Sequence, residues 1–325
     1  MLEISAGNAI EYLHTRGWSF TAPSVCELGG GVSNIVVLVD APEGRLVLKQ
    51  ALGKLRVEQD WFSDRERIFR ESQAIARLGP HLPRGALPEV LFEDRPNLLF
   101  AMSAAPRGWN NWKSELLRGA IDERVAEAAA VYLTAMISAS RGNAEWKKEF
   151  EDQTVFDQLR LDPYYRGTAL RHPDLASHFA GLMDESRARR VSLVHGDWSP
   201  KNLLVGENGV MAIDFEVIHY GDPSFDSAFL LNHLILKSFH LPHLADRFTA
   251  LARRFWNTLL ERLSEDRAWL EAATLRHLGC LMLARVDGKS PAEYLTAGER
   301  DAVRQFARRL ILEPPATLEE ALPKT

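Results

Sequence analysis

The hydrophobic pattern changes near residue 102, and this change constrains the fold more than any other feature of the sequence. Before it, short apolar runs separated by turn residues predict an antiparallel sheet, and residues 64–78 predict one amphipathic helix. The expected strands cover residues 24–28, 35–39, 46–49, 86–92 and 98–102. Beyond it, helical periodicity dominates, as in residues 122–140, 248–263, 268–283 and 298–310. We therefore expect an α+β fold with two lobes, a small sheet lobe over residues 1–102 and a larger, mainly helical lobe over residues 103–325.

Composition excludes several classes of protein. A hydrophobic fraction of 46% with a net charge of only −5 is incompatible with a mainly disordered chain and gives no basic excess for nucleic acid. Cys26 and Cys280 lie far apart, so we expect neither a disulfide framework nor a zinc site. The apolar runs are too short to span a membrane, which needs about 20 residues. We expect a cytoplasmic protein without a nucleic-acid or membrane partner.

A second β-rich island lies within the helical half. Short strands are expected over residues 191–194, 202–205 and 210–214. The first two are joined by a polar loop with His195, Gly196 and Asp197, and Asn202 follows five residues after Asp197. Residues 207–209, Glu-Asn-Gly, form a strong turn signal before the third strand, which ends at Asp214. This order of strands and loops allows the polar side chains at the strand ends to converge.

The residue types in this island suit phosphoryl transfer. One carboxylate must orient the attacking hydroxyl and accept its proton, and hard oxygen ligands must hold Mg²⁺ across the phosphates. Asp197 suits the first role, while Asn202 and Asp214 suit the second. Glu216, two residues further on, is expected to help through the metal or its waters. The alternative is a structural turn that Asn202 caps, and His195 is expected only to brace the loop by a side-chain hydrogen bond.

A glycine run lies between the first two expected strands. Gly29, Gly30 and Gly31 leave backbone unhindered, so a nucleotide can approach it closely. The run is not a complete G-x-G-x-x-G motif, because Asn34 occupies the position of its last glycine. A hairpin turn is the competing interpretation.

Lys49 ends an apolar strand whose neighbours suggest burial. A buried lysine is costly unless it is paired, and a phosphate on one side with a carboxylate on the other would satisfy it. Glu71, in the expected helix 64–78, is the preferred partner, and Glu58 and Glu66 are its competitors.

The order of these features resembles the aminoglycoside phosphotransferase and choline kinase family of the protein-kinase-like superfamily. The shared order is glycine turn, strand lysine, helical glutamate, hinge, His-Gly-Asp loop and Ile-Asp-Phe-Glu segment. The resemblance implies ATP and Mg²⁺ as cofactors, with adenine held by backbone near residues 100–104. The nucleotide-binding residues it implies are Gly29, Gly30, Gly31, Ser33, Asn34, Lys49, Glu71 and Met102.

A narrower resemblance is to methylthioribose kinases. It rests on Lys-Gln-Ala-Leu at residues 49–52 and on His-Tyr-Gly-Asp-Pro at residues 219–223, followed by Asp226, which is expected to support the catalytic loop. Two features depart from that family. Here Arg285 stands alone where a pair of arginines binds the sugar, and the catalytic loop has a Lys-Asn form. Arg285 either contacts substrate or forms a surface ion pair, and Trp198 either lines the acceptor site or packs under the loop.

These features favour a kinase that transfers phosphate from ATP to a hydroxyl of a small, sugar-like metabolite. An aminoglycoside or an amino alcohol such as choline or homoserine is the alternative acceptor. No acidic cluster suited to a polycation is evident, which favours a neutral sugar. No activation segment ends in Ala-Pro-Glu, which argues against a protein kinase. A non-catalytic nucleotide-binding module is the alternative of another class, and the presence of Lys49, Asp197, Asn202 and Asp214 argues against it. A homodimer is left open.

Overall fold

The computed structural model describes residues 2–29, 33–53, 64–263 and 267–324. They form two compact units. Unit 1 comprises Met1–Trp109 together with Met211–Val217, and unit 2 comprises Asn110–Val210 and Ile218–Thr325. The segment that carries Asp214 and Glu216 therefore belongs to unit 1, although it follows the catalytic-loop island in the sequence. Both cysteines are free, as expected.

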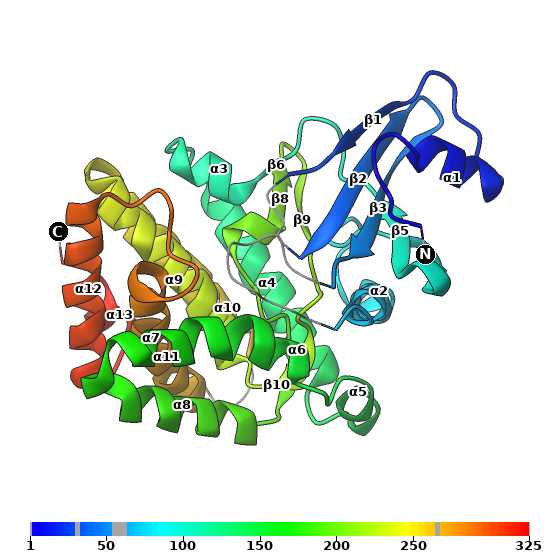
Figure 1. The fold of residues 1–325 in the computed structure, drawn as a ribbon. Coiled ribbons are helices and arrows are strands. Elements are labelled where there is room, and N and C mark those ends of the chain that lie inside the picture. The colour runs from blue at the N-terminus through cyan, green and yellow to red at the C-terminus, as the bar shows by residue number, and fades with distance from the viewer. Residues whose placement is uncertain (1, 30–32, 54–63, 264–266, 325) are drawn as a thin grey trace. The chain divides into compact units, whose positions relative to one another are not determined.

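Unit 1 is built on an antiparallel sheet of five strands in the order β1-β2-β3-β5-β4 (Figure 1). The strands are β1 (Ser24–Glu27), β2 (Asn34–Ala41), β3 (Gly44–Ala51), β4 (Val90–Asp94) and β5 (Leu99–Ser103). Two α-helices accompany them, α1 (Ala9–Thr15) and α2 (Arg67–Leu78). All five expected strands have a counterpart, but the fourth covers Val90–Asp94 and not residues 86–92, and the helix expected over residues 64–78 begins at Arg67.

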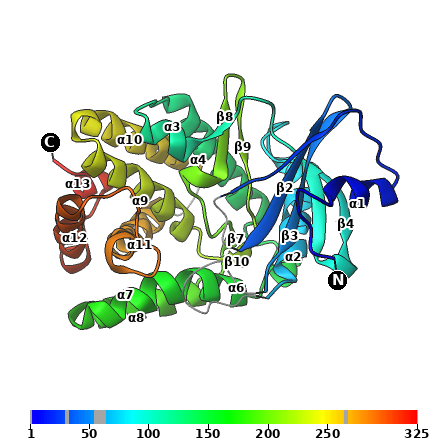
Figure 2. The same cartoon turned by 45° about the horizontal axis from the view of Figure 1, so that its top comes forward.

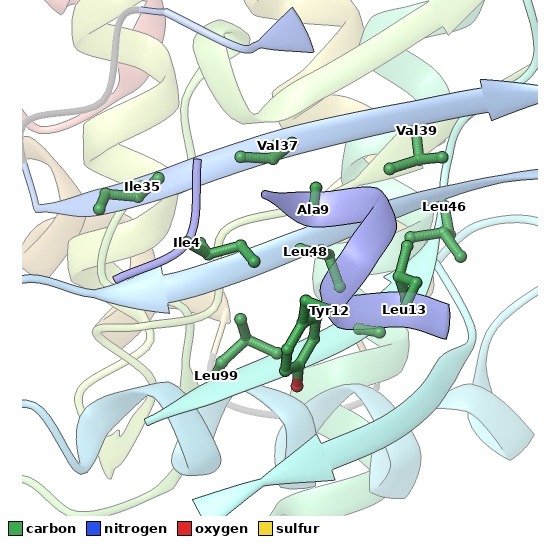
Figure 3. Close-up of a cluster of buried hydrophobic side chains, with 11 residues drawn as sticks. Ile4, Ala9, Tyr12, Leu13, Ile35, Val37, Val39, Leu46, Leu48 and Leu99 are labelled. Carbon is green, nitrogen blue, oxygen red and sulfur yellow. The ribbon is translucent and has the colours of Figure 1, made fainter. Parts of the chain in front are cut away.

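The two faces of this sheet are covered by different helices. Side chains alternate between the faces of a strand, so Leu46 and Leu48 point to the face that carries α1. Figure 3 shows Ala9 and Leu13 of α1 against this apolar face. Lys49 points to the opposite face, where α2 packs on β3, β4 and β5. The pleat of β3 thus directs one polar side chain toward α2 while its neighbours build the core.

Unit 2 is mainly helical. Its helices are α3 (Trp112–Leu117), α4 (Glu123–Ser140), α5 (Ala144–Glu149), α6 (Thr154–Phe156), α7 (Gly167–Arg171), α8 (Ala176–Ala188), α9 (Ser224–His240), α10 (Ala245–Arg262), α11 (Arg267–Asp287), α12 (Ala297–Leu312) and α13 (Leu318–Ala321). Helices α4, α10, α9, α11 and α12 pack side by side in that order (Figure 2). Helix α9 is buried on nearly all sides, which explains its apolar sequence. None of the described helices is long and apolar enough to cross a membrane.

Short strands and a π-helical segment complete unit 2. The strands are β6 (Asn110–Asn111), β7 (Ser192–Val194), β8 (Leu203–Gly206), β9 (Gly209–Ala212) and β10 (His219–Gly221). They form a pair, β10-β7, and a three-stranded sheet, β6-β8-β9, and the last two residues of β9 belong to unit 1. The π-helical segment Asp157–Arg166 precedes α7. The tail after Glu313 contains the short helix α13, because Thr317 caps this helix and Leu318 is buried.

Candidate active site

Lys49 is the centre of a buried ionic cluster in unit 1. Its side-chain nitrogen Nζ donates to both carboxylate oxygens of Glu71, at 2.9 and 2.7 Å, and to Oδ1 of Asp214 at 2.5 Å. Lys49 is only 4% exposed and Glu71 is fully buried. The predicted pairing with Glu71 is confirmed. Glu66 is exposed before the start of α2, and Glu58 lies outside the described residues.

The charges of this cluster hold Lys49 protonated. Burial alone would lower the pKa of Lys49, but Asp214, Glu71 and Glu216 together raise it above its usual value. Burial raises the pKa of Glu71, and Lys49 opposes that shift. An ammonium group has three hydrogen atoms to donate, and all three find carboxylate oxygens here. A phosphate that approaches Lys49 must therefore take the place of one carboxylate.

Asp214 has an unusual backbone conformation. Its φ angle is 70°, in the left-handed region that non-glycine residues rarely adopt. Such backbone strain costs about 1–3 kcal/mol and persists only where the surroundings enforce it, often at functional sites. On either side of the expected metal ligand, the buried Phe215 and the strand β9 anchor the chain.

Glu216 joins three polar side chains of unit 1. Its carboxylate accepts hydrogen bonds from Ser33 at 2.7 Å and Asn34 at 2.8 Å, and from Arg67 at 3.1 Å. The Arg67 guanidinium also donates to the Ser33 carbonyl at 2.6 Å. Both carboxylate oxygens of Glu216 thus accept hydrogen bonds. This arrangement suits a residue that positions the loop after the glycine run better than one that contacts a metal directly. The sequence analysis missed Arg67, whose only signal is its place at the start of α2.

The remaining predicted nucleotide contacts lie along the sheet. Gly29 follows β1, and a side chain added there would meet no atom within 4 Å. Gly30 and Gly31 lie outside the described residues. Met102, in β5, is buried and pairs with Val47 of β3. Their contacts with a nucleotide stay predictions.

In unit 2, the His-Gly-Asp loop follows β7 and is braced from two sides. The buried Asp226 accepts hydrogen bonds from the backbone N–H groups of His195, at 2.6 Å, and Gly196, at 2.8 Å. The His195 ring nitrogen Nδ1 accepts from the Asp197 N–H at 3.2 Å. Gly196 has a φ of 78°, which favours glycine. The predicted bracing by His195 and support by Asp226 are confirmed.

The Asp226 carboxyl group should make stability depend on pH. Burial raises its pKa to about 7, Asp197 adds to the shift, and the two N–H groups oppose it. The folded state therefore holds this proton more tightly than the unfolded chain, whose aspartates titrate near 4. The stability it contributes is complete below pH 4 and is lost as the pH rises toward 7.

We expect the free energy of unfolding of wild type to fall relative to Asp226→Asn as the pH rises from about 4 to 7. Urea unfolding of both proteins at several pH values measures this difference. Asp184→Asn, at an exposed carboxylate of α8, is the control and should follow wild type. A difference that does not change with pH would contradict the raised pKa.

Arg160 is a site residue that the sequence analysis missed. It lies on the π-helical segment and is buried. Its Nε donates to the Gly196 carbonyl at 2.6 Å, and its terminal nitrogen pairs with Oδ2 of Asp197 at 2.9 Å. A guanidinium fork suits this double contact because its donors are rigidly spaced. The only sequence signal was a charged residue between Leu159 and Leu161.

Asn202 lies beside the same loop. Its side-chain nitrogen donates to the Asp197 carbonyl at 3.0 Å, which leaves its amide oxygen as the group to offer a cation. That oxygen is a hard ligand of the kind that Mg²⁺ prefers, and in unit 1 the Asp214 carboxylate is another. Among the described residues no three His, Cys, Asp or Glu side chains form a metal-binding group on their own. By its chemistry, each of these two oxygen donors fits Mg²⁺.

The two predicted acceptor contacts differ in their surroundings. Trp198 is buried and packs edge-on against His195, with 5.3 Å between ring centroids, which favours packing under the loop. Arg285 is also buried, so the alternative of a surface ion pair does not hold. Its guanidinium donates to the Ser290 hydroxyl at 3.0 Å and to the Tyr164 hydroxyl at 3.4 Å.

Comparison with solved structures shows the fold. Amicoumacin kinase hAmiN, solved with AMP-PNP and Ca²⁺, is 15% identical with a TM-score of 0.58, and each chain covers 95% of the other. Spectinomycin phosphotransferase APH(9)-Ia, solved with ADP and spectinomycin, is 14% identical with a TM-score of 0.54 over 98% of both chains. A choline/ethanolamine kinase family protein from Mesorhizobium loti is 16% identical with a TM-score of 0.52, over 94% of this chain and 92% of that one. The expected α+β, protein-kinase-like fold is confirmed.

Comparison of sequences shows the family. Methylthioribose kinase of Enterobacter sp. (strain 638) is 24% identical over 298 residues, which cover 79% of this chain and 74% of that kinase. The model of the phosphotransferase enzyme family (APH) matches residues 24–263. This match includes the Lys49 cluster, the braced Asp197 loop and Asp214. The chain therefore belongs to the phosphotransferase enzyme family and is a phosphotransferase with a hydroxyl acceptor.

Proposed function

We propose that this phosphotransferase is an ATP- and Mg²⁺-dependent kinase that phosphorylates a hydroxyl group of a small, sugar-like metabolite. The observation that carries the proposal is the buried pairing of Lys49 with Glu71 and Asp214. Nucleotide and divalent cation in the solved amicoumacin kinase, and the likeness to a methylthioribose kinase, add support. An ATP-dependent reaction and free thiols fit a cytoplasmic location.

When the nucleotide binds, Lys49 exchanges one of its carboxylate partners for the phosphate groups. Phosphate oxygens take the place of Asp214 on the ammonium group, while Glu71 keeps Nζ in position. When bound, Mg²⁺ would be held by Asp214 and Asn202 and would supply positive charge that neutralises the phosphates. Glu216 keeps Ser33 and Asn34 in place beside the glycine run.

On the acceptor side, Asp197 orients the hydroxyl group and accepts its proton. The acceptor oxygen forms a bond to the γ-phosphorus, the bond from that phosphorus to the oxygen bridging it to the β-phosphate breaks, and ADP leaves. The hydroxyl proton passes to Asp197. Arg160 and His195 fix the position of this aspartate, so little reorganisation is needed when the proton moves.

Arg160 should act as a positioning residue for Asp197. We expect Arg160→Met to lower kcat by about 10–100-fold, because a misplaced base reacts slowly, with little change in the KM for ATP. Arg160→Lys, which keeps the charge, should recover part of the loss. Steady-state kinetics measures both, with the exposed Arg118→Met as control. If Arg160 had only a structural role, Arg160→Met and Arg160→Lys would lose the same share of kcat, and both would unfold at a lower temperature than wild type.

Release of ADP from Mg-ATP over a panel of hydroxyl compounds tests the proposal. The panel contains methylthioribose, ribose analogues, aminoglycosides, choline and homoserine, and the Asp197→Ala protein is the blank. We expect release that depends on a sugar-like acceptor and is absent from the blank. An aminoglycoside or amino alcohol as the sole acceptor would overturn the sugar-like class. No turnover of any kind, including ATP hydrolysis, would favour the non-catalytic module.

A further inference from the structure

A group of buried and half-buried basic side chains lies in unit 2 on three helices. We call Lys113 of α3, His233 and Lys237 of α9, and Arg285 of α11 the cation cluster. Figure 2 shows α9 and α11 side by side, as their contacts require. Lys237 and Lys113 approach the same ring, that of Tyr294, at 5.5 and 5.9 Å from its centroid. Four basic side chains are thus concentrated in one region.

Lys237 has too few partners for a buried ammonium group. It is 0% exposed. Nζ donates to the His233 carbonyl at 3.0 Å and faces the Tyr294 ring, but no carboxylate among the described residues pairs with it. A buried charge without a counter-charge is costly. The fold keeps this lysine where leucine or methionine would pack at lower cost.

Arg285 has unused hydrogen-bonding capacity. It is 7% exposed, and neither its Nε nor the hydroxyl of Tyr294 has a hydrogen-bond partner among the residues that the structure describes. Buried polar atoms without partners are uncommon in folded proteins, so these two atoms are available to a ligand. The atoms left over here are donors, which an anion can satisfy.

The charges in this region do not balance. Glu293 is the acidic residue paired with the cluster, through Lys113. Burial, followed by Lys113 and Arg285, lowers the pKa of Lys237 to about 7, and Glu293 only partly offsets them. Burial lowers the pKa of His233, and Arg285, Lys237, Lys113 and Lys201 lower it further. Within the part of the chain that the structure describes, the basic side chains of the cluster outnumber the carboxylates paired with it.

The cation cluster is connected to the catalytic loop within unit 2. Arg160, which pairs with Asp197, lies with its guanidinium carbon 6.0 Å from the centroid of the Tyr164 ring. The hydroxyl group of the same tyrosine accepts from Arg285 at 3.4 Å. The cluster and the proposed base are therefore separated by two side chains.

We propose that the cation cluster binds a carboxylate or phosphate group of the acceptor whose hydroxyl reacts at Asp197. The inference rests on the proposed function for the reacting hydroxyl and extends it to the class of acceptor, a hydroxylated acid or a sugar phosphate. An anion would supply the missing counter-charge of Lys237 and accept from Arg285. A polycationic aminoglycoside would be repelled by the same residues.

Binding without turnover is the first test. The thermal unfolding midpoint is measured with inorganic phosphate or with glycerate against chloride at constant ionic strength, without nucleotide. A ligand that binds the folded state raises this midpoint. We expect a rise for wild type and for the exposed-site control Lys148→Met, and none for Lys237→Met. An equal rise in Lys237→Met, as binding at Lys49 would give, overturns the proposal, and so does no rise in wild type.

The stability of the unliganded variant is a second readout. Methionine replaces the buried ammonium group with an apolar side chain of similar size, which is often stabilising at such positions. We expect unliganded Lys237→Met to unfold at a higher temperature than wild type while it loses the response to anions. A lysine kept only for structure would give the opposite result, a lower unfolding temperature. Arg285→Gln repeats the anion test if Lys237→Met does not fold.

Matched acceptors test the link to catalysis. Glycerate is compared with glycerol, gluconate with glucose, and ribose 5-phosphate with ribose, in the presence of Mg-ATP. We expect the anionic member of at least one pair to have the higher kcat/KM by about 10–100-fold, as lost hydrogen bonds to a charged group would give. The preference should vanish in Lys237→Met with an unchanged KM for ATP. The carboxylate and phosphate pairs identify which anion is used.

The two proposals fail in different ways. Anion binding that depends on Lys237, without any phosphoryl transfer, would support the anion site and contradict the proposed kinase activity. Phosphoryl transfer to the neutral and anionic members of each pair at equal rates would support the kinase activity and contradict the anion site.

Discussion

Asp197→Ala should lower kcat by about 10²–10⁴-fold, the range in which general bases contribute, while the KM for ATP stays close to that of wild type. The reason is that Asp197 is the group proposed to orient the acceptor hydroxyl and accept its proton. Its backbone is held by the His195 ring and its carboxylate by Arg160, so the loop keeps other supports in the variant. Initial rates with saturating Mg-ATP and acceptor measure the loss.

Asp197→Asn is the matched variant for this prediction. It keeps the size of the side chain and an oxygen for Arg160, but it does not accept a proton at neutral pH. We expect it to be nearly as inactive as Asp197→Ala. An asparagine variant with wild-type kcat would mean that Asp197 only places the acceptor, and the assignment of a general base would be wrong.

Lys49→Met should lose both activity and stability. Without the ammonium group the buried Glu71 and the Asp214 carboxylate face each other without a counter-charge. Breaking a buried ion pair from one side typically costs about 3–5 kcal/mol. The KM for ATP should rise and kcat fall, because no cation from the sheet reaches the phosphates.

A double variant separates the two effects of Lys49. Lys49→Met combined with Glu71→Gln removes one uncompensated charge, so we expect it to recover part of the lost free energy of unfolding but none of the activity. Urea unfolding and ATP titration of the single and double variants measure this. Recovery of activity with stability would show that Lys49 serves the fold alone, and that the nucleotide binds elsewhere.

Local patterns were sufficient to predict much of the fold. Alternating apolar residues predict β2 and β3, and the pairing of Lys49 with Glu71 follows from a lysine in a buried strand next to one amphipathic helix. Bracing of the Asp197 loop by His195 follows from the short spacing within the motif. These features depend on residues close in sequence or on simple charge balance.

Contacts between distant segments were not predictable in the same way. Arg160 reaches the Asp197 loop from 37 positions away, and no local spacing marks an arginine in a π-helical segment as its partner. The strand β10 has three residues and is a strand only because it pairs with β7. Helix α13 forms because Leu318 occupies a buried position, which the proline-rich sequence of the tail does not reveal.

The chemical class of the acceptor also depends on contacts between distant segments. The sequence has no evident acidic cluster suited to a polycation, which favours a neutral sugar as the acceptor. The cationic residues Lys113, Lys237 and Arg285 are spread over more than 170 positions and come together only in the packed helices. Their concentration is a property of the fold, and it indicates an anionic acceptor where the sequence alone gave no sign of charge.

Transfer of the terminal phosphate of ATP to an acceptor is the most direct test of the central claim. With γ-³²P-labelled ATP, Mg²⁺ and the acceptor panel, we expect label on the acceptor from wild type, and none from Asp197→Asn within the time in which wild type reaches completion, or after addition of EDTA. Label on the acceptor from Asp197→Asn at the wild-type rate, or label released only as inorganic phosphate in every reaction, would contradict a kinase that works through Asp197.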